Sequence, residues 1–233
     1  MTSTTRIAPA PPRAHKTLDR VLTPVLTPPG GKGSARISAM GDSERELAAL
    51  EDRMARNLIG PPEKLTGPIE IADYDPGWPA MYELEAARIR AALGDRVVRL
   101  EHVGSTSVPG LPAKPIIDIV LEVLDASDED AYVPALEAAG YRLRGREPEW
   151  FEHRLFKGPD RDVHLHTFSA GCEEFDRMVL FRDWLRANAA DRDLYVRTKR
   201  ELASRPWTYM QQYADAKTEI VQQIMARAEA ASS

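Results

Sequence analysis

Cysteine is almost absent from this chain of 233 residues, in which Cys172 is the one example. A single thiol excludes a disulfide within the chain and any zinc site built from several cysteines, and it suits a reducing compartment. A chain of this length can bury a sizeable core without such links. We therefore expect one globular domain with appendages.

Long hydrophobic runs and an excess of positive charge are also lacking. The longest apolar stretch, 116–124, is interrupted by Asp118 and Glu122, and it is far shorter than the roughly 20 residues of a membrane-spanning helix. The net charge of −5 and the pI of about 5.6 argue against a general nucleic-acid-binding protein, which is typically basic. These features predict a soluble, cytoplasmic protein that binds neither membranes nor nucleic acids in general.

The first 40 residues differ in composition from the rest of the chain. They hold six basic residues, one acidic residue and six of the 18 prolines. Such a segment cannot offset the entropy of ordering, so residues 1–42 are predicted to form a disordered basic tail. A transit peptide, a segment that touches nucleic acid or a membrane surface, and an extension upstream of a start at Met40 or Met54 are the alternatives. We favour the extension, because compositional tails seldom carry a specific function.

Residues 43–65 are predicted to form a short charged helix and a linker. Leu47, Leu50, Met54 and Leu58 recur at spacings of three or four, and a Gly-Pro-Pro sequence at 60–62 ends the pattern.

The domain expected at 66–231 contains both strands and helices. Alternating and helical hydrophobic patterns predict strands at 68–72, 97–103, 115–123, 141–144, 150–156 and 162–168, and helices at 78–93 and 127–139. From residue 173 onward only helices are predicted, the last one after Pro206. Within it an aromatic and methionine stripe that includes Met210, Tyr213 and Lys217 is interpreted as a packing surface.

The order of these elements excludes a doubly wound dinucleotide-binding fold, because strands and helices do not alternate strictly. A small mixed β-sheet with helices packed on it, followed by a C-terminal helical cluster, fits the order better. In the strand at 115–123, four aliphatic residues line one face, while Asp118 and Glu122 share the other face with Val120.

The segment most suggestive of chemistry is 101–118, with the sequence EHVGSTSVPGLPAKPIID. A loop of small residues between two strands lets backbone amides approach an anion, and hydroxyl groups add donors. Asp118, on the next strand, could hold a divalent cation against a phosphate. The segment is neither a Walker loop nor a nucleophile elbow, and an ordinary turn is the alternative. The candidate phosphate-binding residues here are Gly104, Ser105, Thr106, Ser107 and Lys114.

The strand at 162–168 places Asp162, His164, His166 and Phe168 on one face. With Asp118, this face could ligate a metal ion, since imidazole and carboxylate together suit zinc or manganese. Structural, hydrogen-bonded histidines are the alternative.

Three further polar residues are weaker candidates. His102 could act as a base or contact phosphate, although histidines at loop edges commonly only donate or accept a hydrogen bond. Arg154 and Lys157 could contact phosphate, and a solvated face explains them equally well.

The segment 101–118 resembles the signature of the GrpB family, HVGSTSVPGLxAKPIID, which is grouped with the nucleotidyltransferase superfamily. The resemblance continues in YDPGWP at 74–79, HLH at 164–166 and FRDWLR at 181–186, and it covers about residues 68–228. Similar domains also occur fused to dephospho-CoA kinase.

The resemblance implies a nucleotidyltransferase-like α/β fold in which Gly104 and Ser105 bind nucleotide phosphate. Asp118 would be the first metal-binding carboxylate, and Asp162 would lie on the strand that carries a further one. Both are therefore the candidate catalytic acids.

One departure from the superfamily pattern concerns the second acid. Active members place it two residues after the first, where this chain has Val120. Glu122 follows on the same face, but it lies roughly 13 Å from Asp118 along the strand, too far to share one ion easily. On the later strand, His164 and His166 accompany Asp162.

A metal-dependent nucleotidyltransferase with an unknown acceptor is therefore the first hypothesis, with Mg, Mn or Zn as the divalent metal. A non-catalytic module that binds a nucleotide or the phosphates of a CoA-like molecule is the second, and the valine favours it. A purely structural domain, the third, would have no affinity for anions.

Overall fold

The structure is a computed structural model that describes residues 42–160 and 162–232. The predicted basic tail lies outside these residues, except for Asp42, where the first helix begins. No helix in the two described ranges is both long and apolar enough to cross a membrane.

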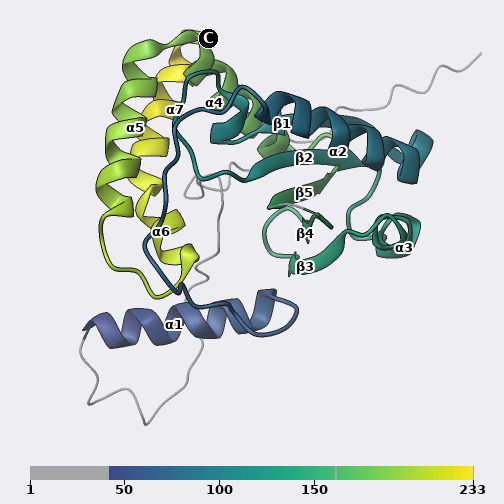
Figure 1. The fold of residues 1–233 in the computed structure, drawn as a ribbon. Coiled ribbons are helices and arrows are strands. Elements are labelled where there is room, and N and C mark those ends of the chain that lie inside the picture. Colours follow the sequence, from purple (N-terminus) through teal and green to yellow (C-terminus); the bar gives the residue numbers. More distant parts are fainter. Residues whose placement is uncertain (1–41, 161, 233) are drawn as a thin grey trace, which may run out of the picture.

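A five-stranded mixed sheet forms the centre of the fold (Figure 1). Its strands, in the spatial order β1-β2-β5-β4-β3, are β1 (Arg99–Val103), β2 (Ile117–Val123), β5 (Val163–Ser169), β4 (His153–Lys157) and β3 (Arg142–Glu147). The pair β2 and β5 is parallel, and the other neighbours are antiparallel. The predicted fold class, a small mixed sheet flanked by helices, is confirmed.

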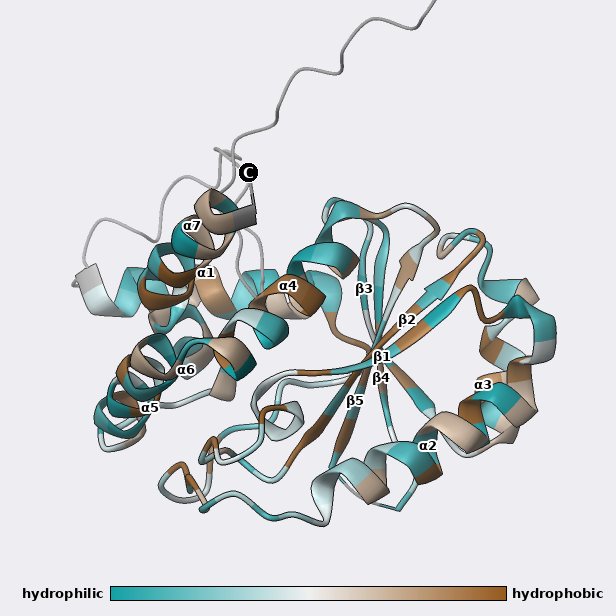
Figure 2. Ribbon diagram, turned by 90° about the horizontal axis from the view of Figure 1, so that it is seen from above, coloured by the Kyte–Doolittle hydropathy of each residue, from teal (hydrophilic) through white to brown (hydrophobic). Residues whose placement is uncertain are grey.

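Helices cover both faces of this sheet (Figure 2). On one face, α2 (Trp78–Leu93) and α3 (Val133–Ala138) pack over Ile117, Ile119 and Leu121. On the other face, α4 (Glu173–Ala187) packs over Val120. The alternation predicted for this strand is confirmed, and it places Asp118 on the α4 face.

Three helices form the C-terminal cluster: α5 (Ala189–Ala203), α6 (Met210–Ala216) and α7 (Thr218–Ser232). The loop between β1 and β2 is anchored in this cluster, because Val108 and Leu111 are fully buried against side chains of α4, α5 and α7. The cluster therefore fixes the loop as well as packing beside the sheet.

The predicted charged helix is α1 (Asp42–Asn57). Its Leu50 and Met54 are buried against Tyr209, which precedes α6. The chain then runs along β3, where the amide of Ile59 donates to the carbonyl of Arg144 at 2.8 Å. The helix and the segment after it thus connect the exposed edge of the sheet to the C-terminal cluster.

Three sequence predictions were wrong in detail. Residues 68–72 form no strand, because Ile69 packs against the C-terminal helices and only Ala72 pairs, with Ala113. The helix predicted from Ser127 begins only at Val133, after a 3-10 turn at Glu129–Ala131, and the Ser127 hydroxyl donates instead to Asp125. The last helix is divided into α6 and α7, since the amide of Lys217 closes a tight turn on the carbonyl of Ala214.

Candidate functional site

The parallel pair β2 and β5 places an acid and two histidines on the α4 face of the sheet. Asp118 lies opposite His164, and Val120 lies opposite His166. The Oδ1 atom of Asp118 is 3.4 Å from the Nδ1 atom of His164. One donor atom from each of Asp118, His164 and His166 lies within 4.8 Å of the other two, a spacing that could hold a metal ion. The sequence predicted these three residues together with Asp162, which is not part of the group.

The loop after β1 passes directly over Asp118. Gly104 has φ = 68°, and a Cβ atom there would lie 2.9 Å from both the Cβ and the Cγ of Asp118. Only glycine permits this backbone conformation together with so close an approach. The glycine of the candidate phosphate loop therefore also shapes the surroundings of the carboxylate.

The hydroxyl groups of the loop divide into two roles. Thr106 donates to the carbonyl of Ile116 at 2.9 Å, and Ser107 donates to the carbonyl of Gly104 at 2.6 Å. Both side chains are buried, so they hold the loop in shape and do not face a ligand. Ser105 lines a cavity and accepts a hydrogen bond from Lys199 at 3.0 Å.

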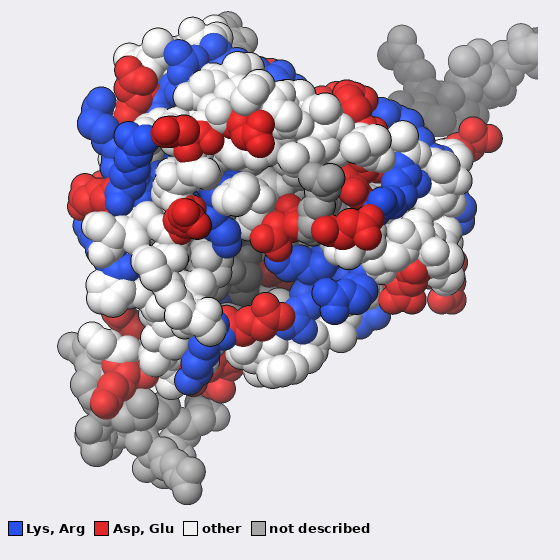
Figure 3. Space-filling view, in the orientation of Figure 1, with Lys and Arg blue, Asp and Glu red and all other residues white. Residues whose placement is uncertain are grey.

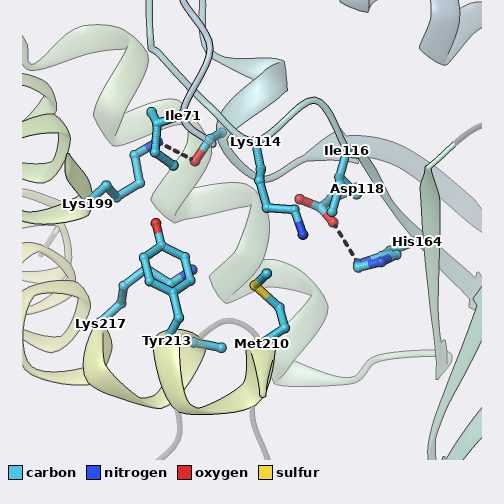
Figure 4. A pocket seen from close by; sticks show the side chains of 11 residues that line it. Ile71, Lys114, Ile116, Asp118, His164, Lys199, Met210, Tyr213 and Lys217 are labelled. Atoms are coloured by element: carbon cyan, nitrogen blue, oxygen red, sulfur yellow. Dashed lines mark hydrogen bonds and ion pairs between the residues drawn. The ribbon is translucent and has the colours of Figure 1, made fainter. Parts of the chain in front are cut away.

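This cavity, of about 100 Å³, lies between the sheet and the C-terminal helices (Figure 4). It is larger than the roughly 10–15 Å³ that one water molecule needs. Its walls combine one acid, one histidine and three lysines with apolar groups: Ile71, Ser105, Lys114, Ile116, Asp118, His164, Lys199, Met210, Tyr213, Ala214 and Lys217. On the surface, the molecule is hollowed between these parts, and Lys and Arg side chains gather beside the hollow (Figure 3).

Two of the three lysines come from the C-terminal helices, and the sequence analysis did not identify either as a site residue. Lys199 belongs to α5 and is buried, with its Nζ donating to the carbonyl of Pro112 at 2.6 Å. Lys217 follows α6, and its Nζ lies 4.9 Å from the centre of the Tyr213 ring. The one feature of the sequence that pointed to Lys217 was its position within the aromatic and methionine stripe of the last predicted helix. Met210 and Tyr213 of that stripe pack in the core with Leu202, and together with Lys217 they also line the cavity.

Burial lowers the pKa values of the lysines that line this cavity. It lowers the pKa of Lys199 to about 7, and the positive charge of Lys217 acts in the same direction. It lowers the pKa of Lys217 to about 8, against the attraction of Asp118. The pKa of Lys114 is also lowered by burial. Crowded, desolvated ammonium groups of this kind gain charge when an anion enters between them.

Asp118 keeps its negative charge in this setting. Burial acts to raise its pKa, but the hydrogen bond and the charge of His164, followed by His166 and Lys217, bring the pKa below its usual value. Asp118 therefore remains an ionised carboxylate at neutral pH, as a metal ligand must be.

Several predicted site residues do not join this group. His102 lies on the opposite face of the sheet, where its ring stacks on Tyr82 at 4.8 Å between centroids. Burial lowers its pKa to about 4, and its Nε2 is hydrogen-bonded to Thr106 at 3.1 Å. Arg154 lies on that far face too, opposite Thr167, and donates to Glu129 at 2.7 Å. Strand alternation decides both positions.

Two acids also lie apart from the ion-binding group. Asp162 precedes β5 and is exposed, and it neither lines the cavity nor belongs to the metal-ligand group of the described residues. Glu122 is bonded to Arg99 at 2.6 Å, farther along β2. The position of the expected second acid, Val120, is fully buried under α4. Asp118 is thus the carboxylate of the candidate metal site.

A family model described as "GrpB protein" matches residues 68–227. The chain belongs to the GrpB family. The match includes all the residues that line the cavity and leaves α1 outside it.

Several bacteria have proteins that are similar to this GrpB chain. A UPF0157 protein of Halalkalibacterium halodurans is 54% identical over 191 residues, which cover 82% of this chain and 98% of that protein. A dephospho-CoA kinase of Mycolicibacterium paratuberculosis is 31% identical over a region that covers 59% of this chain and 40% of the kinase. The crystal structure of the conserved protein GrpB from Enterococcus faecalis matches with a TM-score of 0.59 and 30% identity, covering 68% of this chain and 96% of that one.

Proposed function

We propose that this GrpB protein is a metal-dependent nucleotidyltransferase. The observation that supports this most directly is that a carboxylate of the candidate metal site and three lysines line one cavity. The Asp118 carboxylate lines the same walls as three lysine side chains, next to Ser105 of the glycine-containing loop. A nucleotidyl transfer needs both features, because a metal ion and basic groups must neutralise the polyphosphate together.

The lysines and the loop form the side of the cavity that would receive phosphate. Lys114 extends from the loop, and Lys199 and Lys217 face it from the helices (Figure 4). Lys199 also holds Ser105 by a hydrogen bond, so its ammonium group and this hydroxyl are positioned together. These groups would orient the triphosphate so that an acceptor attacks the α-phosphorus while the bond to the departing pyrophosphate breaks.

The donor set of Asp118, His164 and His166, of which the first two line the cavity, fits a divalent metal ion. It comprises one ionised carboxylate and two imidazoles, and Gly104 leaves space beside the carboxylate that any side chain would fill. A bound ion would neutralise charge on the phosphate oxygens during transfer. The residues of this chain that would hold it are Asp118, His164 and His166.

A second candidate function is non-catalytic binding of a nucleotide or of CoA-like phosphates. The buried Val120, in place of a second acid, favours it, because a two-metal arrangement lacks one of its bridging ligands. The similarity to a dephospho-CoA kinase adds CoA-like phosphates to the ligands worth testing. The fold itself does not decide between transfer and binding.

The test is a thermal-unfolding panel of nucleoside triphosphates and CoA, with and without Mg²⁺, Mn²⁺ or Zn²⁺. A ligand at 100 times its Kd should stabilise the folded protein by about 2.7 kcal/mol. Asp118→Asn should abolish the metal-dependent part of this stabilisation. Glu122→Gln is the matched control, because Glu122 lies on the same strand face but is bonded to Arg99.

Product analysis then separates the two candidate functions. Release of pyrophosphate from a triphosphate, dependent on metal and on Asp118, would support the transferase. Binding that leaves the ligand intact across a broad panel of acceptors would favour the binding module. Absence of stabilisation by every nucleotide and metal would contradict both.

A further inference from the structure

A row of three buried, hydrogen-bonded side chains leads from the sheet edge to the candidate metal site. The Oε2 atom of Glu147 lies 2.6 Å from Nδ1 of His153, and Nε2 of His153 lies 3.0 Å from Nδ1 of His166. Their relative exposures are 6%, 1% and 3%, so water competes little for these bonds. His166 is the member that also belongs to the metal-ligand group.

The surrounding structure holds His153 tightly in this row. Its ring stacks on the His166 ring at 5.2 Å and meets the edge of the Trp150 ring at 4.8 Å. The chain reaches it through Phe151 and Glu152, which both have φ = 53°. Two consecutive non-glycine residues in this region are uncommon, and the structure around them must hold them there.

An ionised Glu147 sets the proton positions along the row. Its carboxylate only accepts hydrogen bonds, so Nδ1 of His153 then donates to it. A neutral imidazole has one N–H group, which makes Nε2 of His153 an acceptor. Nδ1 of His166 must then donate to it, and Nε2 of His166 is left with a free lone pair.

We propose that Glu147 and His153 are positioning residues that present Nε2 of His166 as a metal ligand and make the site selective for transition metal ions. This inference rests on the proposed function, because it concerns the same metal site. The set of Asp118, His164 and His166 offers two imidazole nitrogens to one carboxylate. Zn²⁺, Co²⁺ and Mn²⁺ accept such ligands, whereas Mg²⁺ requires oxygen ligands in octahedral geometry.

The test uses the full chain and Co²⁺ as a spectroscopic probe, with affinities for Co²⁺, Zn²⁺ and Mg²⁺ measured by calorimetry. Wild type should bind Co²⁺ with visible absorption bands and should prefer Co²⁺ and Zn²⁺ to Mg²⁺. His153→Phe keeps an aromatic ring but removes the acceptor for His166, and it should weaken Co²⁺ binding roughly 10- to 100-fold. Glu147→Gln changes the polar group with little change of shape and should weaken binding to a smaller extent.

The control is Glu85→Gln. Glu85 is a buried carboxylate that accepts a hydrogen bond from Tyr141 on the opposite side of the sheet. This variant should lose stability without any change in Co²⁺ affinity or in the absorption bands. If the row had a purely structural role, the variants of Glu147 and His153 would behave like Glu85→Gln and lose stability without a change in Co²⁺ affinity.

The outcomes separate this inference from the proposed function. Wild-type affinity and bands in both Glu147→Gln and His153→Phe would overturn the positioning role and leave the metal site in place. A wild-type preference for Mg²⁺ would overturn the selectivity. Failure of wild type to bind any of the three metals would overturn the metal site itself, and with it the metal dependence of the proposed function.

Discussion

Gly104 and Asp118 lie against each other so closely that no side chain fits between them. A Cβ atom on Gly104 would lie 2.9 Å from the Cβ and Cγ atoms of Asp118. The loop that would bind phosphate and the carboxylate that would bind metal are therefore one structural unit. A larger side chain at residue 104 would therefore displace the carboxylate of Asp118.

Gly104→Ala is expected to destabilise the protein and to disturb the metal site. The alanine would be strained at φ = 68° and ψ = −173°, a region that is essentially restricted to glycine, at a cost of about 1–3 kcal/mol, and its overlap with Asp118 should add about 1–3 kcal/mol. Urea unfolding measures the loss of stability, and calorimetry with Co²⁺ measures the loss of affinity.

Gly110→Ala is the matched control for this variant. Gly110 has φ = 76° in the same loop, but no atom lies within 4 Å of the position of its Cβ. It should show the strain alone and keep the metal affinity of wild type. Equal losses in the two variants would mean that the close approach to Asp118 has no energetic role.

Anion binding in the cavity should weaken as the pH rises from 7 to 9. The ligand-free pKa values of Lys199 and Lys217, about 7 and 8, lie below the usual value for lysine, so both groups lose positive charge within this range. Calorimetric titration with sulfate measures this directly, because the charge of sulfate is constant over the range.

Lys217→Arg is the control for the pH effect. An arginine stays charged throughout this range, so the variant should show a flatter pH dependence than wild type. An affinity for sulfate that is independent of pH in wild type would contradict the assignment of the lysines to the anion site.

Lys157→Met should strengthen the binding of a divalent cation. The Nζ atom of Lys157 is hydrogen-bonded to Nε2 of His164, whose Nδ1 faces Asp118. Removing a positive charge so close to the site should increase metal affinity roughly fivefold, which corresponds to about 1 kcal/mol. Lys64→Met, which removes an exposed lysine beside Tyr209, should leave the affinity unchanged. Weaker metal binding in Lys157→Met would show that this lysine supports the site.

Met54→Ala should lower the free energy of unfolding by about 2 kcal/mol, the lower end for a buried methionine. Met54 is 5% exposed and packs with Leu50 and Tyr209, although α1 lies outside the region matched to the GrpB family. Urea unfolding measures the change, with the exposed Arg56→Ala in the same helix as control. An effect as small as that of the control would mean that α1 contributes little to the stability of the domain.

Much of the fold follows from local patterns in the sequence. The helix predicted at 78–93 has the same bounds in the structure, because apolar spacing and a terminal glycine act over a few residues. Alternation placed His164 and His166 on one face of their strand, and Asp118 opposite the aliphatic face of its own strand, before any pairing was known. The alternation of side chains along a strand depends only on the backbone, so the alternation predicted from the sequence is found again in the structure.

Predictions from local patterns were wrong where contacts with another part of the chain determined the structure of a segment. Ile69 and its neighbours have the composition of a strand, but they pack against the C-terminal helices. Ser127 looked like a helix cap, yet its hydroxyl bonds to Asp125 and the helix starts six residues later. In both cases, contacts between distant segments outweighed a weak local preference.

The sequence by itself determined that His164 and His166 would share one face of their strand, and that a glycine-containing loop would precede Asp118. Only the tertiary structure decided which groups complete the site. Lys199 and Lys217 reach the cavity from the C-terminal helical cluster, about 80 to 100 residues after Asp118, while His102 and Arg154 lie on the opposite face of the sheet. The two lysines are too far from Asp118 in sequence to leave a periodic signal, because their positions depend on how whole helices pack against the sheet.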